Sequence, residues 1–300
     1  MTENQLADLI ILSDEPLARY TSARIGGPAD YVTVAGNVEV LLGAVAHAQE
    51  RGLDWLVLGS GSNVLVSEAG VRGMVIVNKT RQVAFWGDGR VYAESGVNLI
   101  SLARNCIARG LAGLEWAVSV PGTVGGAVVG NAGAHGGDIA TVLERASILK
   151  PDGTVVEWTA EQFQYEYRDS LLKREKSGRV VLAATFRLKL ADVGELASRA
   201  DQFVARRKAT QPPGASIGSM FKNPNGDYAG RLIEAAGLKG MRIGGAQISP
   251  VHANFFINAD NATADDVKAL VDRARQQVQQ RFGVELELEI ELIGEWGSDD

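Results

Sequence analysis

The chain contains 300 residues, of which 46% are hydrophobic and 22% are charged. This composition excludes a largely disordered chain and supplies enough apolar residues for two or three hydrophobic cores. The formal net charge of -6 argues against a nucleic-acid-binding protein, because such a protein needs a basic surface for the phosphates. Any anionic ligand must therefore be held by a local site.

The first residues are not typical of a targeting signal. Residues 1–20 are predicted to be a poorly defined lead-in, and the apolar run at 9–12 is too short for a signal peptide or a membrane span. We therefore expect a cytoplasmic protein without membrane or nucleic-acid partners, in which Asn261-Ala-Thr263 is a turn rather than a glycan acceptor. We also expect no metal site, because no ligand spacing relates the three histidines, His47, His135 and His252.

A tight turn, a helix and a strand are the first predicted elements. Gly26-Gly27 before Pro28 favours a defined turn. Asn37 is expected to cap a helix whose apolar residues recur at helical spacing up to Gly52. A short apolar strand at 55–58 is then broken by Gly59-Ser-Gly-Ser-Asn63. This order is typical of the start of an α/β ligand site.

The glycine turn at 59–63 matches neither of two common phosphate-binding motifs. A dinucleotide fingerprint needs glycine where Val64 stands, and a P-loop needs a Gly-Lys-Ser/Thr sequence that follows none of the glycines. The turn still offers main-chain amides and the hydroxyls of Ser60 and Ser62. These groups suit a pyrophosphate held by a nest of backbone donors.

The next segment is predicted to combine strands with one helix. The helix at 98–109 ends at Gly110, and Cys106 within it is expected to be a small buried hydrophobe rather than a reactive thiol. The predicted strands are 74–78, 82–85, 91–94, 146–150, 155–158 and 180–190.

The centre of the chain is a glycine-rich run from Pro121 to Gly137. Seven of its seventeen residues are glycine, so the backbone can adopt positive φ and approach a flat or anionic ligand closely. A flexible linker is the alternative, but linkers are polar and serine-rich, whereas Val124, Val128 and Val129 anchor this run. We interpret it as a ligand cradle, although glycine alone does not identify the ligand.

A short polar turn, Phe163-Gln-Tyr-Glu-Tyr-Arg-Asp-Ser170, lies before the strand at 180–190. A solvated surface loop is the simpler interpretation of its Tyr-Arg pair. Arg168 gains a functional role only if other groups converge on it.

The last third of the chain has its own elements. An amphipathic helix ends at Gln211-Pro-Pro-Gly214, where we place a domain boundary. Thr263 and Asp266 form a predicted capping box. The predicted elements are helices at 191–209, 228–236 and 263–282, a strand at 254–258, and a final strand.

The final strand alternates cleanly between apolar and acidic residues. A row of glutamates on one strand face is usually a solvated sheet surface, and spacing alone does not say whether one of them turns into a cleft. The apolar positions are Val284, Leu286, Leu288, Ile290 and Leu292, and the acidic positions are Glu285, Glu287, Glu289 and Glu291.

With these pieces in order, the chain resembles the UDP-N-acetylenolpyruvoylglucosamine reductases, the flavoprotein MurB family of peptidoglycan synthesis. The resemblance spans nearly the whole chain. Its first two stretches also resemble the wider vanillyl-alcohol-oxidase-like flavoproteins. The stretches that carry it are Ile25-Gly-Gly-Pro-Ala-Asp30, Leu58-Gly-Ser-Gly-Ser-Asn-Val-Leu65, Pro121-Gly-Thr-Val-Gly-Gly126 with Asn131-Ala-Gly-Ala134, Tyr167-Arg-Asp-Ser170, Gly218-Ser-Met-Phe-Lys-Asn-Pro224 and Leu286-Glu-Leu-Glu-Ile-Glu-Leu-Ile-Gly294.

The resemblance implies an α+β fold with a two-subdomain FAD-binding part (PCMH or vanillyl-alcohol-oxidase-like) and a C-terminal α+β substrate-binding domain. The implied domains are a lead-in at 1–20, FAD-binding subdomains at 21–80 and 81–210, and a substrate-binding domain at 211–300. Non-covalent FAD would be held largely through main-chain amides. The implied cofactor-binding residues are Gly59, Ser60, Gly61, Ser62, Asn63, Pro121, Gly122, Thr123, Gly125, Gly126, Asn131, Ala132 and Gly133.

The reaction implied by the resemblance is the reduction of UDP-N-acetylglucosamine enolpyruvate to UDP-N-acetylmuramate, with NADPH as hydride donor. By motif, Arg168 and Glu289 resemble the pair that polarises the substrate carboxylate, and Ser219 resembles the acid that protonates the carbanion. The residues expected to face the UDP-sugar are Lys222, Asn223, Gln247 and His252.

The chain departs from the family pattern at Ala215-Ser-Ile217, where a Pro-Ser-Ala run is usual. It resembles the shorter form of the family, which lacks the inserted tyrosine loop. Two other functions stay open: a flavin-dependent oxidase of the same superfamily, which has no need of the 218–224 stretch, and a non-catalytic flavin- or nucleotide-binding module.

Overall fold

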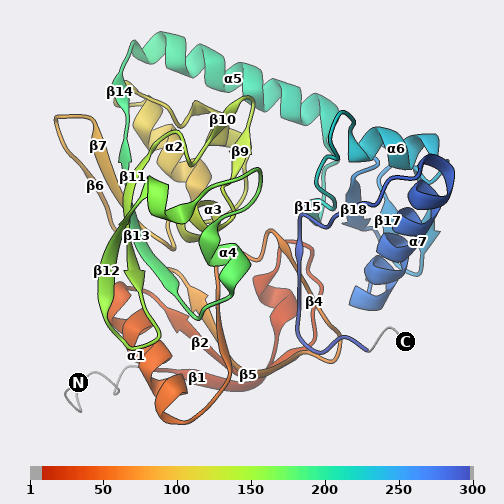
Figure 1. Ribbon diagram of the computed structural model, residues 1–300, viewed down its shortest axis with the longest axis horizontal. Helices are drawn as coiled ribbons and strands as arrows, with labels where there is room; N and C mark the ends of the chain where they lie inside the picture. Colours follow the sequence, from red (N-terminus) through yellow and green to blue (C-terminus); the bar gives the residue numbers. More distant parts are fainter. Residues whose placement is uncertain (1–8, 298–300) are drawn as a thin grey trace. The chain divides into compact units, whose positions relative to one another are not determined.

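The computed structural model describes residues 9–297, and the chain folds into two compact units (Figure 1). Unit 1 comprises residues 9–10, Thr33–Gly59 and Ile76–Arg207, and unit 2 comprises Ile11–Val32, Ser60–Val75 and residues 208–297. Neither unit is one continuous stretch. The division after Arg207 lies near the predicted boundary at 210/211, whereas the predicted subdomain at 21–80 is divided between both units.

The first part of the chain forms a four-stranded sheet. Its order is β1 (Ile11–Pro16), β2 (Pro28–Ala35), β5 (Val71–Asn78) and β3 (Trp55–Leu58). The prediction of an irregular lead-in is wrong for residues 11–20, which form β1 and the 3-10 helix η2 (Leu17–Tyr20). Polar residues dominate β1, so its alternation gives no strong strand signal. The rest of the predicted lead-in, residues 1–8, lies outside the described residues.

Five antiparallel strands form the main sheet of unit 1. The strands predicted at 82–85 and 91–94 pair as one hairpin and those at 146–150 and 155–158 as another, with Val83 opposite Ala93 and Ala146 opposite Trp158. The strands, in sheet order, are β12 (Val155–Thr159), β11 (Leu143–Leu149), β13 (Val180–Arg187), β7 (Arg90–Glu94) and β6 (Val83–Phe85).

The single strand predicted at 180–190 is two strands. β13 ends at Arg187, and β14 (Lys189–Leu190) pairs with β8 (Leu111–Ala112) instead of β7. Another two-stranded hairpin joins β9 (Gly133–Ala134) to β10 (Gly137–Asp138) inside the glycine-rich run.

Local sequence signals determine where the helices of unit 1 begin. Asn37 caps α1 (Val38–Glu50) by accepting a 2.8 Å hydrogen bond from the Val40 amide, and Asn98 caps α2 (Leu99–Ile107) by accepting one of 2.9 Å from the Ser101 amide. The other helical elements are η3 (Glu115–Ser119), α3 (Val124–Val129), η4 (Ala160–Phe163), α4 (Leu171–Glu175) and α5 (Val193–Thr210). Among residues 9–297, no helix is long and apolar enough to cross a membrane.

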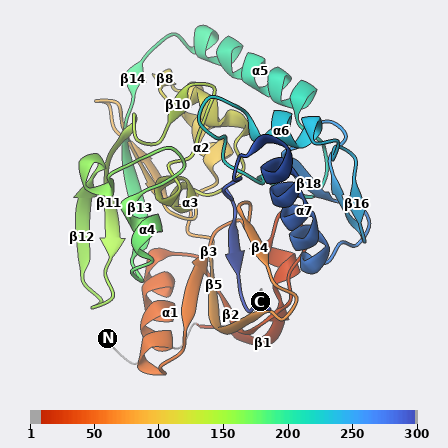
Figure 2. The same ribbon diagram turned by 45° about the vertical axis from the view of Figure 1, so that its right-hand side comes forward.

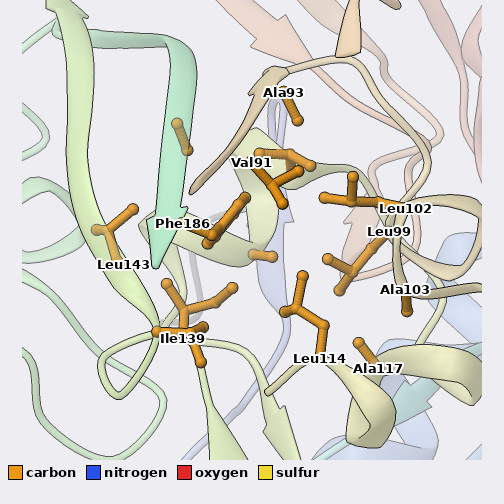
Figure 3. Close-up of a cluster of buried hydrophobic side chains, with 14 of the residues drawn as sticks. Val91, Ala93, Leu99, Leu102, Ala103, Leu114, Ala117, Ile139, Leu143 and Phe186 are labelled. Carbon is orange, nitrogen blue, oxygen red and sulfur yellow. The ribbon is translucent and has the colours of Figure 1, made fainter. Parts of the chain in front are cut away.

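The core of unit 1 forms where the five-stranded sheet meets α2 and η3 (Figure 3). Val91 and Phe186 from the strands and Leu99 and Leu102 from α2 are fully buried. Burying such side chains stabilises the fold by about 1.5–3 kcal/mol each. Cys106 belongs to the same cluster, and burial raises its pKa to about 12. The prediction that Cys106 is buried is confirmed.

Unit 2 contains a second antiparallel sheet with two helices (Figure 2). Helix α7 (Ala264–Phe282) packs against strands of this sheet and contacts α6 (Ala229–Ala235). The predicted capping box is confirmed, since the Asp266 amide donates to Thr263 Oγ1 and the Thr263 amide to Asp266 Oδ2, each at 3.1 Å. The strands, in sheet order, are β15 (Ser216–Ser219), β18 (Phe255–Asn258), β17 (Ala246–Ile248) and β16 (Arg242–Ile243).

The predicted final strand is much shorter than its alternation indicates. Only β19 (Glu291–Ile293) pairs as a strand, parallel to β4 (Val64–Val66). Upstream of it, Leu288 forms an isolated bridge with Phe221. Leu286 and Ile290 are nevertheless buried in the core of unit 2, beside Leu65. The alternation therefore predicted which side chains face inward, but not the extent of pairing.

Candidate functional site

The glycine turn at 59–63 is folded tightly against the end of η2. Gly61 has φ +60°, and a Cβ at this position would lie 2.3 Å from the Tyr20 carbonyl oxygen, so only glycine fits. The Gly61 carbonyl accepts a 3.0 Å hydrogen bond from the Ser22 amide. Within residues 9–297, the structure gives no acceptor to the amides of Ser60, Gly61 and Asn63. The turn thus has the chemistry of an anion-binding nest.

The second glycine segment is held on one side by main-chain hydrogen bonds. The amides of Val124 and Gly125 donate to the carbonyls of Val97 (2.9 Å) and Ser95 (2.8 Å). Thr123 caps α3 by accepting from the Gly126 amide at 3.4 Å. These bonds make the start of α3 an ordered part of unit 1 rather than a linker.

Besides Gly61, the predicted cofactor-binding residues Gly59 and Gly125 are also required to be glycine by close packing. A Cβ on Gly125 would lie 2.9 Å from Ser95 Cβ, and one on Gly59 would lie 2.5 Å from Thr123 Oγ1. Gly126 differs, because its nearest neighbour would be 3.7 Å away and the residue is exposed. Pro121 is exposed as well. The segment therefore packs on the protein through Gly59 and Gly125, while Pro121 and Gly126 are exposed.

Asn131 links this segment to the turn that carries Arg168. It is buried with φ +43°, and its Nδ2 donates to the Glu166 carbonyl at 2.9 Å. Its Oδ1 accepts from the Ala140 amide at 3.1 Å. Both ends of this side chain thus have protein partners, and together with Ala132 and Gly133 it remains a predicted cofactor contact through main chain.

The turn around Arg168 is clamped to the end of α3. The Tyr165 hydroxyl donates to the Val128 carbonyl at 2.9 Å, and Ser170 Oγ donates to the Val129 carbonyl at 2.6 Å. Ser170 is fully buried, and burial raises the pKa of Tyr165. The sequence motif contained Ser170, but nothing in the residue pattern assigned it or Tyr165 an anchoring role.

Arg168 itself has an uncommon conformation. Its φ of +57° is rare for a residue with a side chain, and strain of this kind persists only where the surroundings hold it. Its Nη2 donates to the Gly133 carbonyl at 2.6 Å, and its guanidinium lies 5.3 Å from the centre of the Tyr167 ring. Arg168 is therefore joined directly to the glycine-rich run by a hydrogen bond within unit 1.

Unit 2 brings Ser219 and Glu289 onto adjacent backbone segments. Ser219 ends β15, and the carbonyl of the next residue, Met220, accepts a 2.9 Å hydrogen bond from the Glu289 amide. Among the four glutamates of the alternating segment, Glu289 alone is half-buried, while Glu285, Glu287 and Glu291 are exposed. Burial thus distinguishes the one glutamate that spacing could not.

Asn63, at the end of the glycine turn, is hydrogen-bonded to the segment that carries Glu289. Asn63 Nδ2 donates to the Glu289 carbonyl at 3.2 Å, and the Asn63 carbonyl accepts from the Glu291 amide at 2.9 Å. A predicted cofactor-binding residue and two predicted catalytic residues therefore lie close together in unit 2. Arg168 belongs to unit 1.

Asn254 is hydrogen-bonded to the segment that follows Ser219, and no sequence pattern selects it. It is 3% exposed, and its side chain both accepts from the Phe221 amide (3.0 Å) and donates to the Phe221 carbonyl (2.8 Å). Its own carbonyl accepts from the Met220 amide at 2.8 Å. Asn254 fixes the backbone directly after Ser219. A lone asparagine at the start of a strand carries no signal for this role.

The four predicted substrate contacts all have protein partners as well. Lys222 pairs with Glu287, and Asn223 Oδ1 accepts from the Ala229 amide at 3.1 Å, which leaves its Nδ2 to a ligand. Gln247 Nε2 donates to the Gly240 carbonyl at 3.1 Å. His252 Nδ1 accepts from the Asn254 amide at 3.2 Å, and burial lowers the pKa of this histidine.

Comparison with known proteins covers nearly the whole chain. Residues 29–159 match the family described as "FAD binding domain", and residues 206–293 match "UDP-N-acetylenolpyruvoylglucosamine reductase, C-terminal domain". The UDP-N-acetylenolpyruvoylglucosamine reductase of Rubrobacter xylanophilus is 46% identical over 284 residues, 94% of this chain and 95% of the relative. That of Chloroflexus aurantiacus is 43% identical over 286 residues, 93% of this chain and 96% of the relative.

A solved structure agrees with these sequence relatives. The crystal structure of UDP-N-acetylenolpyruvylglucosamine reductase (MurB) from Thermus caldophilus is 35% identical and superposes with a TM-score of 0.81, covering 95% of this chain and 98% of that one. The match extends through both predicted parts, the FAD-binding part and the C-terminal α+β domain. The predicted fold class is confirmed.

Proposed function

The chain belongs to the family of UDP-N-acetylenolpyruvoylglucosamine reductases, and from this membership we infer that it reduces UDP-N-acetylglucosamine enolpyruvate to UDP-N-acetylmuramate in peptidoglycan precursor synthesis. It is an FAD-dependent oxidoreductase. We propose NADPH as the hydride donor and the cytoplasm as the place of reaction. In this proposal residues 21–210 bind FAD and residues 211–300 bind the UDP-sugar.

The residues present fit FAD. The amides of Ser60, Gly61 and Asn63 suit its pyrophosphate. The exposed residues Pro121 and Gly126 are the proposed ligand face for its flat ring. When bound, FAD supplies two-electron hydride chemistry between the nicotinamide and the enolpyruvyl double bond. The protein has to hold the reactants, stabilise charge and deliver a proton.

We assign to Arg168 and Glu289 the stabilisation of the negative charge that develops on the substrate. A double bond conjugated to a carboxylate accepts hydride only if negative charge building toward that carboxylate is stabilised. A guanidinium suits this task, because it presents a fixed fork of donors to a carboxylate. Glu289 works beside a substrate carboxylate only if it is protonated or paired with a cation. The hydrogen bond from Arg168 to the Gly133 carbonyl supports the role proposed for Arg168. The partial burial of Glu289 supports the role proposed for Glu289.

Ser219 is proposed to deliver the proton. Serine is a weak acid, but the carbanion formed by hydride addition is a strong base. Asn254 and the Glu289 amide hold the backbone of Met220, immediately after Ser219. The observation that carries the proposed function is this adjacency of Ser219, Glu289 and the glycine turn through Asn63.

One anaerobic titration tests the function against its alternatives. Purified holoenzyme should be yellow, NADPH should bleach it, and UDP-N-acetylglucosamine enolpyruvate should restore the colour without oxygen. An oxidase would regain colour rapidly with oxygen and would ignore the enolpyruvyl ether. A binding module would not be bleached at a catalytically useful rate. Either result would overturn the proposal.

A further inference from the structure

The hairpin of β9 and β10 carries an exposed histidine at its tip. His135 has φ +53°, and its ring stacks flat on Phe203 of α5, with 4.2 Å between ring centres and 6° between planes. Phe203 in turn packs against the core of unit 1. The imidazole is therefore held in one orientation, although it lies at the surface.

Two arginines follow on the same side of α5. Arg206 and Arg207 are three and four residues beyond Phe203, and residues at these spacings share a helix face. Arg207 is half-buried, and burial lowers its pKa. Within residues 9–297, the structure gives the Arg207 side chain neither an ion pair nor a hydrogen bond. A partly desolvated guanidinium is unfavourable without a partner.

No carboxylate is among the groups that shift the titration of His135. Burial, followed by the positive charges of Arg206 and Arg207, lowers the pKa of His135. This shift favours the neutral imidazole, which presents one N–H donor. In a chain with a formal net charge of -6, this cluster is locally positive.

We propose that Arg207 and His135, with Arg206 adding positive charge, bind the diphosphate of a nucleotide ligand. A guanidinium offers paired donors that match phosphate oxygens, and the stacked imidazole adds a fixed third donor. NADPH and the UDP-sugar both carry a diphosphate, so either could supply it. The inference rests on the proposed function, because that function brings both nucleotides to this protein.

The place of the cluster on the hairpin supports this assignment. Gly133, at the start of β9, accepts the hydrogen bond from Arg168, and His135 follows two residues later, about 7 Å along an extended chain. A ligand whose reactive end meets Arg168 therefore has a second anchoring point within the reach of a nucleotide.

Half-reaction kinetics of the holoenzyme test the proposal. Arg207→Met removes the charge and keeps much of the apolar stem, and His135→Phe keeps the stacked ring and removes its nitrogens. Arg104→Gln, an exposed position on α2, is the control for the change in net charge. Stopped-flow absorbance gives the apparent Kd of NADPH from flavin bleaching and that of UDP-N-acetylglucosamine enolpyruvate from recolouring.

Arg207→Met should raise at least one apparent Kd about tenfold or more, and His135→Phe should raise the same one severalfold. A rise for NADPH alone identifies the dinucleotide as the source of the diphosphate, a rise for the other substrate alone identifies the UDP-sugar, and a rise for both identifies a shared subsite. Apparent Kd values within twofold of wild type in both variants, or changes no larger than in Arg104→Gln, would overturn the proposal.

The use of two variants keeps the test decisive even if one of them misfolds. If Arg207→Met loses FAD, His135→Phe decides the question alone, because it changes only an exposed ring. Failure of this inference is distinct from failure of the proposed function. Wild-type protein that turns over, with variants that bind both nucleotides normally, overturns only the diphosphate site.

Discussion

Asn63 and Glu289, 226 residues apart in sequence, are joined by a 3.2 Å hydrogen bond from a side-chain amide to a main-chain carbonyl. The bond ties the turn proposed to hold the pyrophosphate to the segment proposed to act on the substrate. Asn63→Ala should therefore weaken FAD binding and slow the step that consumes the enolpyruvyl ether. Loss of one such bond predicts severalfold effects, measured by FAD titration and by anaerobic recolouring. An effect on FAD affinity alone would contradict the coupling.

Ser219→Ala should separate the two half-reactions. Bleaching by NADPH should stay near the wild-type rate, because no proton from Ser219 is needed, whereas turnover with the enolpyruvyl ether should fall by on the order of a hundredfold or more. Ser216→Ala in the same strand is the matched control and should affect neither rate strongly. Stopped-flow absorbance measures both steps. If recolouring is unaffected, Ser219 is not the acid.

Two glycine substitutions should affect different properties, one the stability of the fold and the other the affinity for FAD. Gly61→Ala places a Cβ 2.3 Å from the Tyr20 carbonyl oxygen at φ +60°, which should reduce the free energy of unfolding by more than about 2 kcal/mol. Gly126→Ala meets no atom closer than 3.7 Å, and alanine favours the helix. It should fold normally but bind FAD at least about tenfold more weakly, because the new methyl group occupies the ligand face. Denaturant melts and flavin titration distinguish the two results. A Gly126→Ala protein with normal FAD affinity would argue against this face.

The hydrogen bonds of Tyr165 and Ser170 that anchor the turn around Arg168 should contribute to both stability and activity. Ser170→Ala removes a buried hydroxyl that bonds the Val129 carbonyl at 2.6 Å and the Lys173 amide at 3.3 Å. We expect a loss of about 1–3 kcal/mol in the free energy of unfolding. Recolouring by the enolpyruvyl ether should slow more than bleaching by NADPH, because Arg168 loses its orientation. Tyr167→Phe, at an exposed neighbour, is the control. Equal slowing of both half-reactions would indicate general loss of structure instead.

Cys106 should be inert in the folded protein. Burial raises its pKa to about 12, so at pH 8 almost none of the thiol is in the reactive thiolate form. Iodoacetamide should leave the native holoenzyme active and unmodified, and should label Cys106 in urea, where the pKa returns to its ordinary value near 8.5. Mass spectrometry of both samples measures the outcome. Rapid labelling without denaturant would show that the helix opens readily.

Features with a local cause could be predicted from the sequence. The caps at Asn37 and Thr263 depend on residues within three positions, and both occur as expected. Alternation in the final segment identified Leu286 and Ile290 as buried. Pairing could not be predicted in the same way, because a strand also needs a partner, and only residues 291–293 have one in β4.

Features with a distant cause could not be predicted. The four glutamates of the final segment have the same spacing, and only the folded chain distinguishes Glu289 by its burial. Asn254 acts through Phe221, 33 residues away, and no local pattern marks it. The family resemblance supplied candidate roles for Arg168 and Ser219, but not the clamp at Tyr165 and Ser170. The assignments of individual site residues remain predictions.

Each unit is built from separate stretches of the chain, and this limits which fragments of the protein can fold alone. A fragment beginning at residue 208 would lack Ala23, Ile25 and Leu65, which line the core of unit 2. It would also lack β4, so β19 would expose an unpaired edge, a common route to aggregation. Expression of the C-terminal segment alone should therefore give insoluble material, and a soluble version would need residues 11–32 and 60–75 restored by fusion or by a permuted chain order.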